Sequence, residues 1–463
     1  MLIRNAELGG GHIVDLRCER GLVCEIGDSL PLGPGEELID AGGGAVLPGL
    51  HDHHIHLYAL AAANSSVLCG PPKVTDLTQL EAALSAAPGS GWIRGIGYHH
   101  SVAGELDRWT LDALTGDRPV RIQHRSGKLW IVNSAGAEIL ELERHKGLAG
   151  IECRGDGVAN GRLFRLDDWM REQLGSSARP DLGAVSRQLA SYGVTGITDA
   201  TPGNSREEAG VFTRAVDDRQ LLQRVLLMGD LQLPDLQHRY VQRGAYKILL
   251  DELRLPVLEN LAADIGSAHA QGRPVAIHCV TRTELIFALS ALIEAGSFPG
   301  DRVEHASLTP DDVLPLMQQA GVTVVTQHGF IAERGDQYLE DVPAQYHKLL
   351  YRGRAFLEAG LPLAGSSDAP YGSADPWLAM RAAVARTTAR GHCIGEGEAL
   401  TPEQALALFT GHSGCPGGPS RQIVVGEAAD FCLLDRSWQS ARTRLRAGDV
   451  RATVKDGEPI YRR

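Results

Sequence analysis

The sequence lacks the features that mark membrane proteins and nucleic-acid-binding proteins. No apolar run approaches the length of a membrane span, and the first residues, Met1-Leu2-Ile3-Arg4-Asn5, contain no apolar signal core. The formal net charge is -12, and the sequence contains no run of basic residues. An acidic surface does not attract nucleic acid or anionic lipid. We therefore expect a cytoplasmic protein that acts on a small-molecule substrate and binds neither nucleic acid nor a membrane. The sequence leaves open whether the protein forms a homo-oligomer.

The chain also lacks paired cysteines. Its eight cysteines are scattered and form no CxxC motif. Single cysteines spread through a long chain indicate neither a disulfide framework nor a zinc site made of thiolates. We expect reduced thiols, most of them buried.

Both ends of the chain are predicted to form short β-strands. The candidates lie at residues 2–6, 21–26, 429–435 and 450–457, separated by turns rich in glycine and proline. Neither end has enough strands for a stable sheet of its own. We therefore expect residues 1–50 and 418–463 to pair into one small β-sandwich.

The middle of the chain alternates apolar strand-like runs with helical stretches, which is typical of a parallel sheet covered by helices. The first strand carries His54 and His56, and the other seven are predicted at residues 194–199, 224–228, 246–250, 275–278, 303–306, 322–328 and 361–368. Eight such strands predict an α/β fold, a (β/α)8 TIM barrel over residues 51–417 with its active site at the C-terminal strand ends.

The stretch from about 58 to 190 is too long for one crossover of the barrel. It has strand candidates of its own at residues 92–98 and 119–124. We expect an inserted α/β subdomain there.

Histidines and an aspartate recur at the predicted strand ends. His54 and His56 lie two residues apart, so both project from one face of an extended strand, whereas His51 and His53 have the opposite parity or lie one pleat earlier. Taken singly, His278 is typical of a hydrogen-bonded interior histidine and Asp368 of a helix cap or turn. Together with His305 they predict a site for one or two divalent metal ions. Zn²⁺ suits these ligands best, with Mn²⁺, Fe²⁺, Co²⁺ or Ni²⁺ as substitutes.

Lys247, on another predicted barrel strand, is the sixth candidate. An unpaired ammonium group is unfavourable in a barrel interior, so its head group should reach a carboxylate or the water-filled barrel mouth. Alternatively, the neutral amine takes up CO₂ to give N6-carboxylysine, whose two carbamate oxygens could bridge two cations.

These residues belong to motifs that span almost the whole chain. The motifs are residues 48–56, Lys247, His278, Val303-Glu304-His305-Ala306, residues 365–370 and residues 426–431. Together they resemble the amidohydrolase superfamily of metal-dependent hydrolases. The resemblance implies that His54, His56 and Asp368 hold one metal ion and that His278 and His305 hold the other, with carboxylated Lys247 and a hydroxide between them.

A closer resemblance is to the branch that includes N-substituted formamide deformylase. It rests on Gly95-Ile96-Gly97-Tyr98, Val132-Asn133-Ser134 and Asp375-Pro376-Trp377. Three pocket positions depart from that branch. Ser126-Gly127-Lys128 stands where the branch often shows Asp-Gly-His before Asn-Ser. Val280-Thr281 replaces the Gly-Asp that usually follows the histidine of strand five, and His328 stands where proline is common at the end of strand seven.

The resulting prediction is an amidohydrolase that cleaves a C–N bond other than a peptide bond in a small molecule, by means of a metal-activated hydroxide. The bond is an amide, N-acyl, formamide or cyclic amide bond. Asp368 is the predicted general base, which takes a proton from the attacking hydroxide and passes it to the leaving amine. Substrate contacts are predicted at His99, His100, His124, Lys128, Trp130, Tyr246 and His328. For each of these residues, a position on the solvated surface or packing in the pocket wall is an equally open interpretation.

Two other functions stay open. One is a metal-dependent deaminase of an aminated heterocycle. Deaminases of this superfamily usually carry a glutamate three residues after the histidine of strand five, where this chain has Thr281, with Glu284 as the first acidic residue. The other is a non-catalytic binding or scaffold protein on the same fold. Such relatives typically lose metal ligands, whereas all six positions are filled here.

Overall fold

The computed structural model describes residues 1–71, 73–175 and 179–463. The chain divides into two compact units, one made of Met1–Leu57 with Leu182–Arg463 and the other of Tyr58–Asp181. Of the helices in the described part of the chain, none has both the length and the apolar character needed to span a bilayer.

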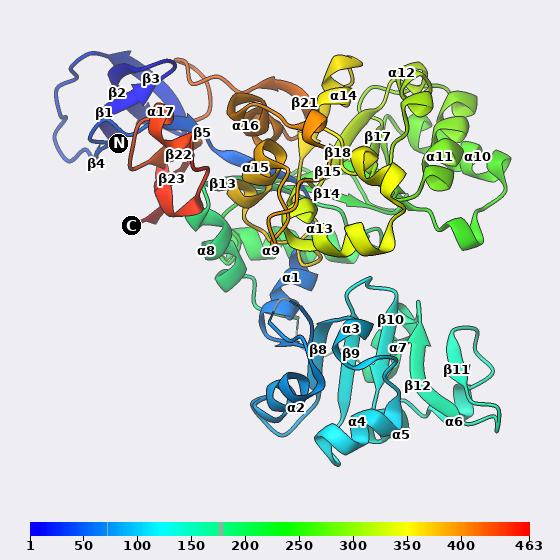
Figure 1. Ribbon diagram of the computed structural model, residues 1–463. Coiled ribbons are helices and arrows are strands. Elements are labelled where there is room, and N and C mark those ends of the chain that lie inside the picture. The colour runs from blue at the N-terminus through cyan, green and yellow to red at the C-terminus, as the bar shows by residue number, and fades with distance from the viewer. Residues whose placement is uncertain (72, 176–178) are drawn as a thin grey trace. The chain divides into compact units, whose positions relative to one another are not determined.

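Eight parallel strands form the centre of the first unit (Figure 1). In sheet order they are β6 (Leu50–Ile55), β13 (Val194–Asp199), β14 (Arg224–Gly229), β15 (Val241–Leu249), β16 (Val275–Cys279), β17 (Arg302–His305), β18 (Thr323–Thr326) and β19 (Leu363–Gly365). The first and last strands meet just beyond their C-terminal ends. There the Asp368 amide donates to the His54 carbonyl at 2.8 Å, and the His56 amide donates to the Ala369 carbonyl at 2.9 Å. The predicted (β/α)8 barrel is thereby confirmed.

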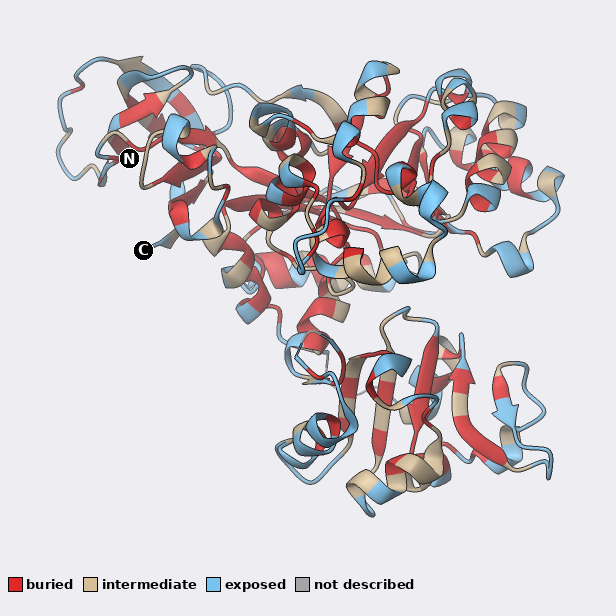
Figure 2. Cartoon of the chain, in the orientation of Figure 1, coloured by how far each residue is buried: buried red, intermediate tan, exposed pale blue. Residues whose placement is uncertain are grey.

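The barrel strands are buried on both faces because helices cover their outer side (Figure 2). Val275, Ala276 and Ile277 of β16 form one such apolar run, as expected for a parallel strand inside a covered sheet. The covering helices are α8 (Gly183–Ser191), α9 (Arg206–Asp217), α10 (Leu258–Ala270), α11 (Arg282–Ala295), α12 (Leu314–Ala320), α13 (Gly329–Asp341), α14 (Arg354–Glu358), α15 (Pro376–Ala385) and α16 (Pro402–Thr410). Capping boxes begin several of them, with Thr281 and Glu284 closing the first turn of α11.

The two chain ends form a pair of small sheets in the same unit. One contains β1 (Leu2–Leu8), β2 (His12–Glu19), β3 (Leu22–Gly27) and β4 (Leu38–Asp40), and the other contains β5 (Val46–Pro48), β22 (Phe431–Leu434), β23 (Val450–Lys455) and β24 (Glu458–Arg462). Ile3 and Leu16 from the first sheet share a buried core with Phe431 and Val454 from the second. The two termini therefore depend on each other for their core, as the shortage of strands at each end predicts.

The second unit has a six-stranded mixed sheet. Its strands are β7 (Val67–Leu68), β8 (Ile93–Tyr98), β9 (Val120–His124), β10 (Leu129–Val132), β11 (Ile151–Cys153) and β12 (Ala159–Phe164). The first three of these run parallel, and the rest pair antiparallel. The accompanying helices are α2 (Leu77–Ser85), α3 (His100–Ala103), α4 (Arg108–Thr115), α5 (Ser134–Ile139), α6 (Leu142–His145) and α7 (Asp167–Leu174). Leu80 and Ile122 belong to one of its apolar clusters and Trp130 and Leu163 to another, so this unit has a core of its own.

Candidate metal centre

Three of the predicted ligands meet where the first and last barrel strands adjoin. His54 lies in β6, His56 directly follows that strand, and Asp368 lies three residues beyond β19. The Nε2 atoms of His54 and His56 each lie 3.4 Å from Oδ1 of Asp368. One ligand atom of each of these side chains lies within 4.8 Å of the others, so one metal ion could bind all three.

The other three predicted ligands extend this group across the barrel end. His305 places Nδ1 4.0 Å from Oδ2 of Asp368, and its ring centre lies 5.0 Å from that of His54. The rings of His278 and His305 are 4.5 Å apart between centres. Lys247 is buried on β15 and interacts electrostatically with His54, His278 and His305. The structure thus brings all six predicted residues to one end of the barrel.

The backbone at two of these predicted ligands is in the left-handed region, with φ of 70° at His305 and 54° at Asp368. Residues other than glycine seldom adopt this conformation, and it persists where surrounding contacts fix it. The His305 carbonyl accepts from Thr326 Oγ1 at 2.7 Å, and the Asp368 amide donates to His54 as described above. These bonds hold the two ligands in a conformation that the chain would not otherwise favour.

Electrostatics favours the metal-binding forms of His54, His278, His305 and Asp368. Burial lowers the pKa of His54 to about 3, and it also lowers the pKa of His278 and of His305, so the rings are neutral near pH 7. Burial likewise lowers the pKa of Lys247. Burial alone would raise the pKa of Asp368, but its hydrogen bond with His56 and the neighbouring imidazoles outweigh burial and lower it, so the side chain is a carboxylate.

Three of the histidines are oriented through Nδ1. The Nδ1 atom of His54 contacts Oε2 of Glu304, that of His56 lies 3.2 Å from Oγ1 of Thr201, and that of His305 lies 2.8 Å from Oε1 of Gln327. An oxygen partner on Nδ1 fixes the ring and leaves Nε2 as the metal-binding atom. This is the arrangement that ligating histidines need.

These partners were missed in the sequence, where Glu304 appears only as part of a motif. Glu304 is fully buried, and its Oε1 accepts from Nε of Arg302 at 2.6 Å. Arg302 also donates to the carbonyl of His53 at 3.0 Å. The available signal was the pair of charged residues two apart in one short strand, since such charges need partners when they are buried.

The E304Q substitution tests this positioning role. Glutamine keeps the shape of the side chain but removes the charge that holds Nδ1 of His54, so we expect metal affinity to fall by about 10- to 100-fold. Competition with a chelator of known affinity measures the change. The matched control is E398Q, because Glu398 also pairs in a buried site with an arginine, Arg352, at 2.7 Å. Equal losses of affinity in both variants would contradict the proposed role.

Lys247 provides a test of whether the residues fit a metal site. Its Nζ atom is buried and has no hydrogen-bond partner among the residues that the structure describes. A buried cation without a partner is unfavourable, whereas a carbamate on the same nitrogen would add oxygens to a set of imidazole and carboxylate donors. That donor set is the one that Zn²⁺ takes in proteins. The residues therefore fit the metal centre that the sequence predicts.

His51 and His53 lie outside this group. Both are buried, and Nε2 of His51 lies 2.9 Å from Oγ1 of Thr198. The register of β6 against β13 shifts between Asp52 and Ile55. A shift of this kind changes which side chains share a face. The four histidines of this segment are thus divided into two pairs.

The predicted substrate contacts fall into different environments. In the first unit, His328 is buried at the start of α13, and Tyr246 lies on the strand face opposite Lys247 with Asp264 of α10 as an electrostatic neighbour. In the second unit, Trp130 is a core residue whose Nε1 donates to Asp167 at 2.7 Å. These surroundings favour packing for Trp130 and Tyr246. Four others, His99, His100, His124 and Lys128, lie in the second unit near the ends of β8 and β9.

Comparison with known proteins agrees with this geometry. A family model described as "Amidohydrolase family" matches residues 37–461. The N-substituted formamide deformylase of Arthrobacter pascens is 26% identical over 93% of this chain and 91% of its own length. Two solved structures of uncharacterized metal-dependent hydrolases also share the fold. The protein from Pyrococcus horikoshii has a TM-score of 0.74 and 21% identity over 99% of both chains. The one from Pyrococcus furiosus has a TM-score of 0.71 and 22% identity over 94% of this chain and 98% of its own. This chain belongs to the amidohydrolase family of hydrolases.

Proposed function

We propose that this protein is a metal-dependent hydrolase that cleaves a non-peptide C–N bond, an amide or formamide, in a small molecule. The observation that carries the proposal is the set of six side chains at one barrel end, with Asp368 facing the Nε2 atoms of His54 and His56. Membership of the amidohydrolase family supports hydrolysis as the reaction.

The contacts support the ligand assignment that the family resemblance implies. His54, His56 and Asp368 would hold one ion, and His278 and His305 would hold a second, with Lys247 between them as N6-carboxylysine. Zn²⁺ is the ion that these donors suit best. When bound, such ions supply a Lewis acid that polarises the scissile carbonyl and lowers the pKa of the attacking water.

Asp368 moves the proton in this proposal. Its two oxygens face different histidines, Oδ1 towards His54 and His56 and Oδ2 towards His305, so the carboxylate lies at the centre of the site. It takes the proton of the attacking water at a carboxylate oxygen and delivers it to the leaving nitrogen. The products are then a carboxylate and a free amine.

Exposed apolar side chains at the same strand ends indicate the class of substrate. Leu249 lies two residues after Lys247, pairs in register with His278 and is 58% exposed. Val280 lies two residues after His278 and is 39% exposed. Large apolar groups left exposed beside a catalytic site favour an apolar ligand surface. We propose a substrate with an apolar substituent near the scissile bond.

A panel of amides tests the reaction and the substrate class together. We expect N-alkyl and N-benzyl formamides or amides to react with a kcat/KM at least about tenfold above that of charged N-acyl amino acids, since each apolar group buried gains roughly 1 kcal/mol or more. Release of the amine is measured by derivatisation. Cleavage of dipeptides in preference to these amides would contradict the proposed bond, and release of ammonia from an aminated heterocycle would contradict the proposed reaction.

The deaminase alternative receives little support from the site. Its acidic residue would be Glu284, whose carboxylate instead accepts from the amides of Val280, Thr281 and Glu252 at 2.8 to 3.1 Å. These bonds use both oxygens of Glu284 to begin α11. A non-catalytic scaffold is also disfavoured, because each of the six ligand positions holds a residue that can bind metal.

A further inference from the structure

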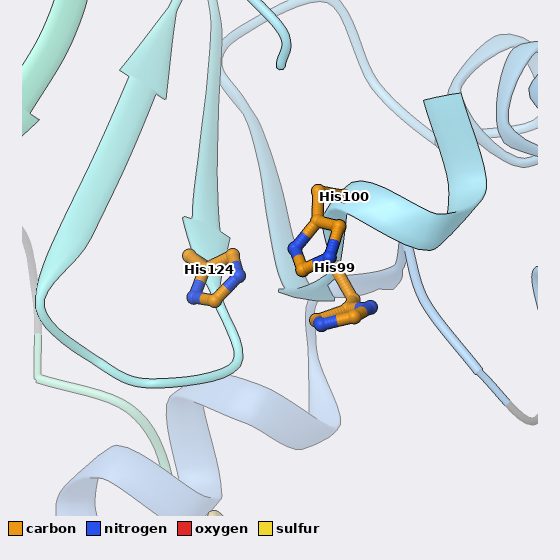
Figure 3. Close-up of side chains that lie close together, drawn as sticks. All are labelled: His99, His100 and His124. Carbon is orange, nitrogen blue, oxygen red and sulfur yellow. The ribbon is translucent and has the colours of Figure 1, made fainter. Parts of the chain in front are cut away.

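A cluster of three histidines lies within the unit formed by residues 58–181. His99 and His100 follow β8, and His124 is the last residue of β9. These strands pair in parallel with Tyr98 opposite His124, so their C-terminal ends lie at one edge of the sheet. Figure 3 shows the three rings gathered beyond those ends, and one ring nitrogen of each lies within 4.8 Å of the others. Side chains beyond the carboxyl ends of parallel strands commonly form binding sites.

Two of the rings are oriented in the same way. His99 places Nδ1 2.8 Å from Oγ of Ser101, and His124 places Nδ1 2.8 Å from Oγ of Ser126. Both motifs have the pattern His-x-Ser. In each motif the backbone amide of the serine also donates to the ring Nδ1, at 3.2 Å. Metal binding at Nε2 requires the ring proton to lie on Nδ1, where it donates to the serine hydroxyl in exchange for the bond from the serine amide.

The surroundings of the cluster leave room for an ion. His100 and His124 line a cavity of about 260 Å³ together with Glu105. The cavity also contains Arg162, whose charge is neutralised by Glu105 at 2.6 Å and Glu152 at 3.3 Å. His99 is 3% exposed, so its ring is held in place by its neighbours. His100 is exposed, and its ring is able to change position.

We propose that His99, His100 and His124 form a metal site of this unit that binds a divalent transition-metal ion, with Zn²⁺ as the preferred ion. Ligand bonds of about 2.0 to 2.1 Å in a tetrahedron require nitrogen atoms roughly 3.4 Å apart. The rings of His99 and His124 lie 5.8 Å apart between centres, so the half-buried ring of His124, together with exposed His100, has to move towards His99 when the ion binds. Three imidazoles leave a fourth position for water or for a carboxylate such as Glu105. The bound ion would link the ends of β8 and β9.

The site rests on residues of the 58–181 unit alone and does not depend on the barrel centre. The same three histidines are predicted substrate contacts, and metal binding gives them a different role. Zinc binding therefore separates the two interpretations, since it can be measured without any substrate.

Isothermal titration of the full-length, untagged protein with Zn²⁺ tests the site. The protein is first loaded at the barrel and freed of excess metal, so that every variant carries the same barrel ions. We expect one further equivalent to bind, with its Kd raised at least about 100-fold in H100A/H124A and roughly tenfold in S126A. The matched control is H145A, because His145 belongs to the same unit but packs on Trp169, 5.4 Å away between ring centres.

The outcomes are distinct. Loss of the extra equivalent in H100A/H124A with retention in H145A supports the site. Equal zinc affinity in wild type and H100A/H124A would overturn it, as would the absence of an extra equivalent in the wild type. Because His100 is exposed, the single variant H100A provides the same comparison should the double variant fail to fold.

Discussion

Replacing Asp368 by asparagine is expected to reduce kcat by about 10³-fold or more, while the protein keeps its fold. Asparagine has nearly the same shape, so the backbone amide of residue 368 still donates its hydrogen bond to the His54 carbonyl. It has no carboxylate to accept a proton, and it places a neutral oxygen or an amide nitrogen where Oδ1 now faces His54 and His56. Steady-state rates on the best substrate of the amide panel, divided by the fraction of folded protein, measure the effect.

The control for this variant is D301N. Asp301 is also fully buried and accepts from the Val275 amide at 2.9 Å, but it precedes β17 and so lies at the N-terminal end of the barrel strands. Its loss should lower stability with little effect on the turnover of folded molecules. Metal analysis of D368N separates loss of the base from loss of an ion. Rates near those of the wild type in D368N would refute the role of Asp368.

The barrel could be predicted because several of its strands are apolar runs of standard length bounded by polar ends. Strand β16, Val275–Cys279, is of this kind, and its burial leaves few alternatives to a covered parallel sheet. β2, His12–Glu19, was not predicted, since it mixes polar and apolar residues and gains its burial from Phe431 and Val454 at the other end of the chain. Packing between distant segments is not visible in a local pattern.

The candidate metal ligands could be predicted from their places along the chain, because His54 and His278 lie near the ends of barrel strands and Asp368 lies three residues beyond one. The side chains that orient these residues could not be predicted in this way. Gln327 and Thr201 are common polar residues after strands, and only the fold places them against His305 and His56. For the same reason the structure was needed to show that Trp130 packs in a core.

Removing His54 and His56 should abolish metal binding at the barrel. In H54A/H56A the site loses the two Nε2 atoms that face Asp368, and we expect bound metal to fall below about a tenth of the wild-type amount. The measurement uses protein that also carries H100A/H124A, so that the second histidine cluster adds no metal. The matched control is H51Q/H53Q, which changes the other two histidines of the same segment.

Thermal unfolding gives an independent measure of the same variant. An ion that binds only the folded state raises its stability by about 2.7 kcal/mol when its free concentration is 100 times Kd. In the H100A/H124A background, the protein with intact barrel histidines and the H51Q/H53Q variant should therefore unfold at higher temperature when Zn²⁺ is added, whereas H54A/H56A should not respond. A variant that keeps its metal and its response to Zn²⁺ without His54 and His56 would show that the ion is held elsewhere. In that case the contacts of these two histidines with Asp368 would be only part of a buried hydrogen-bonded core.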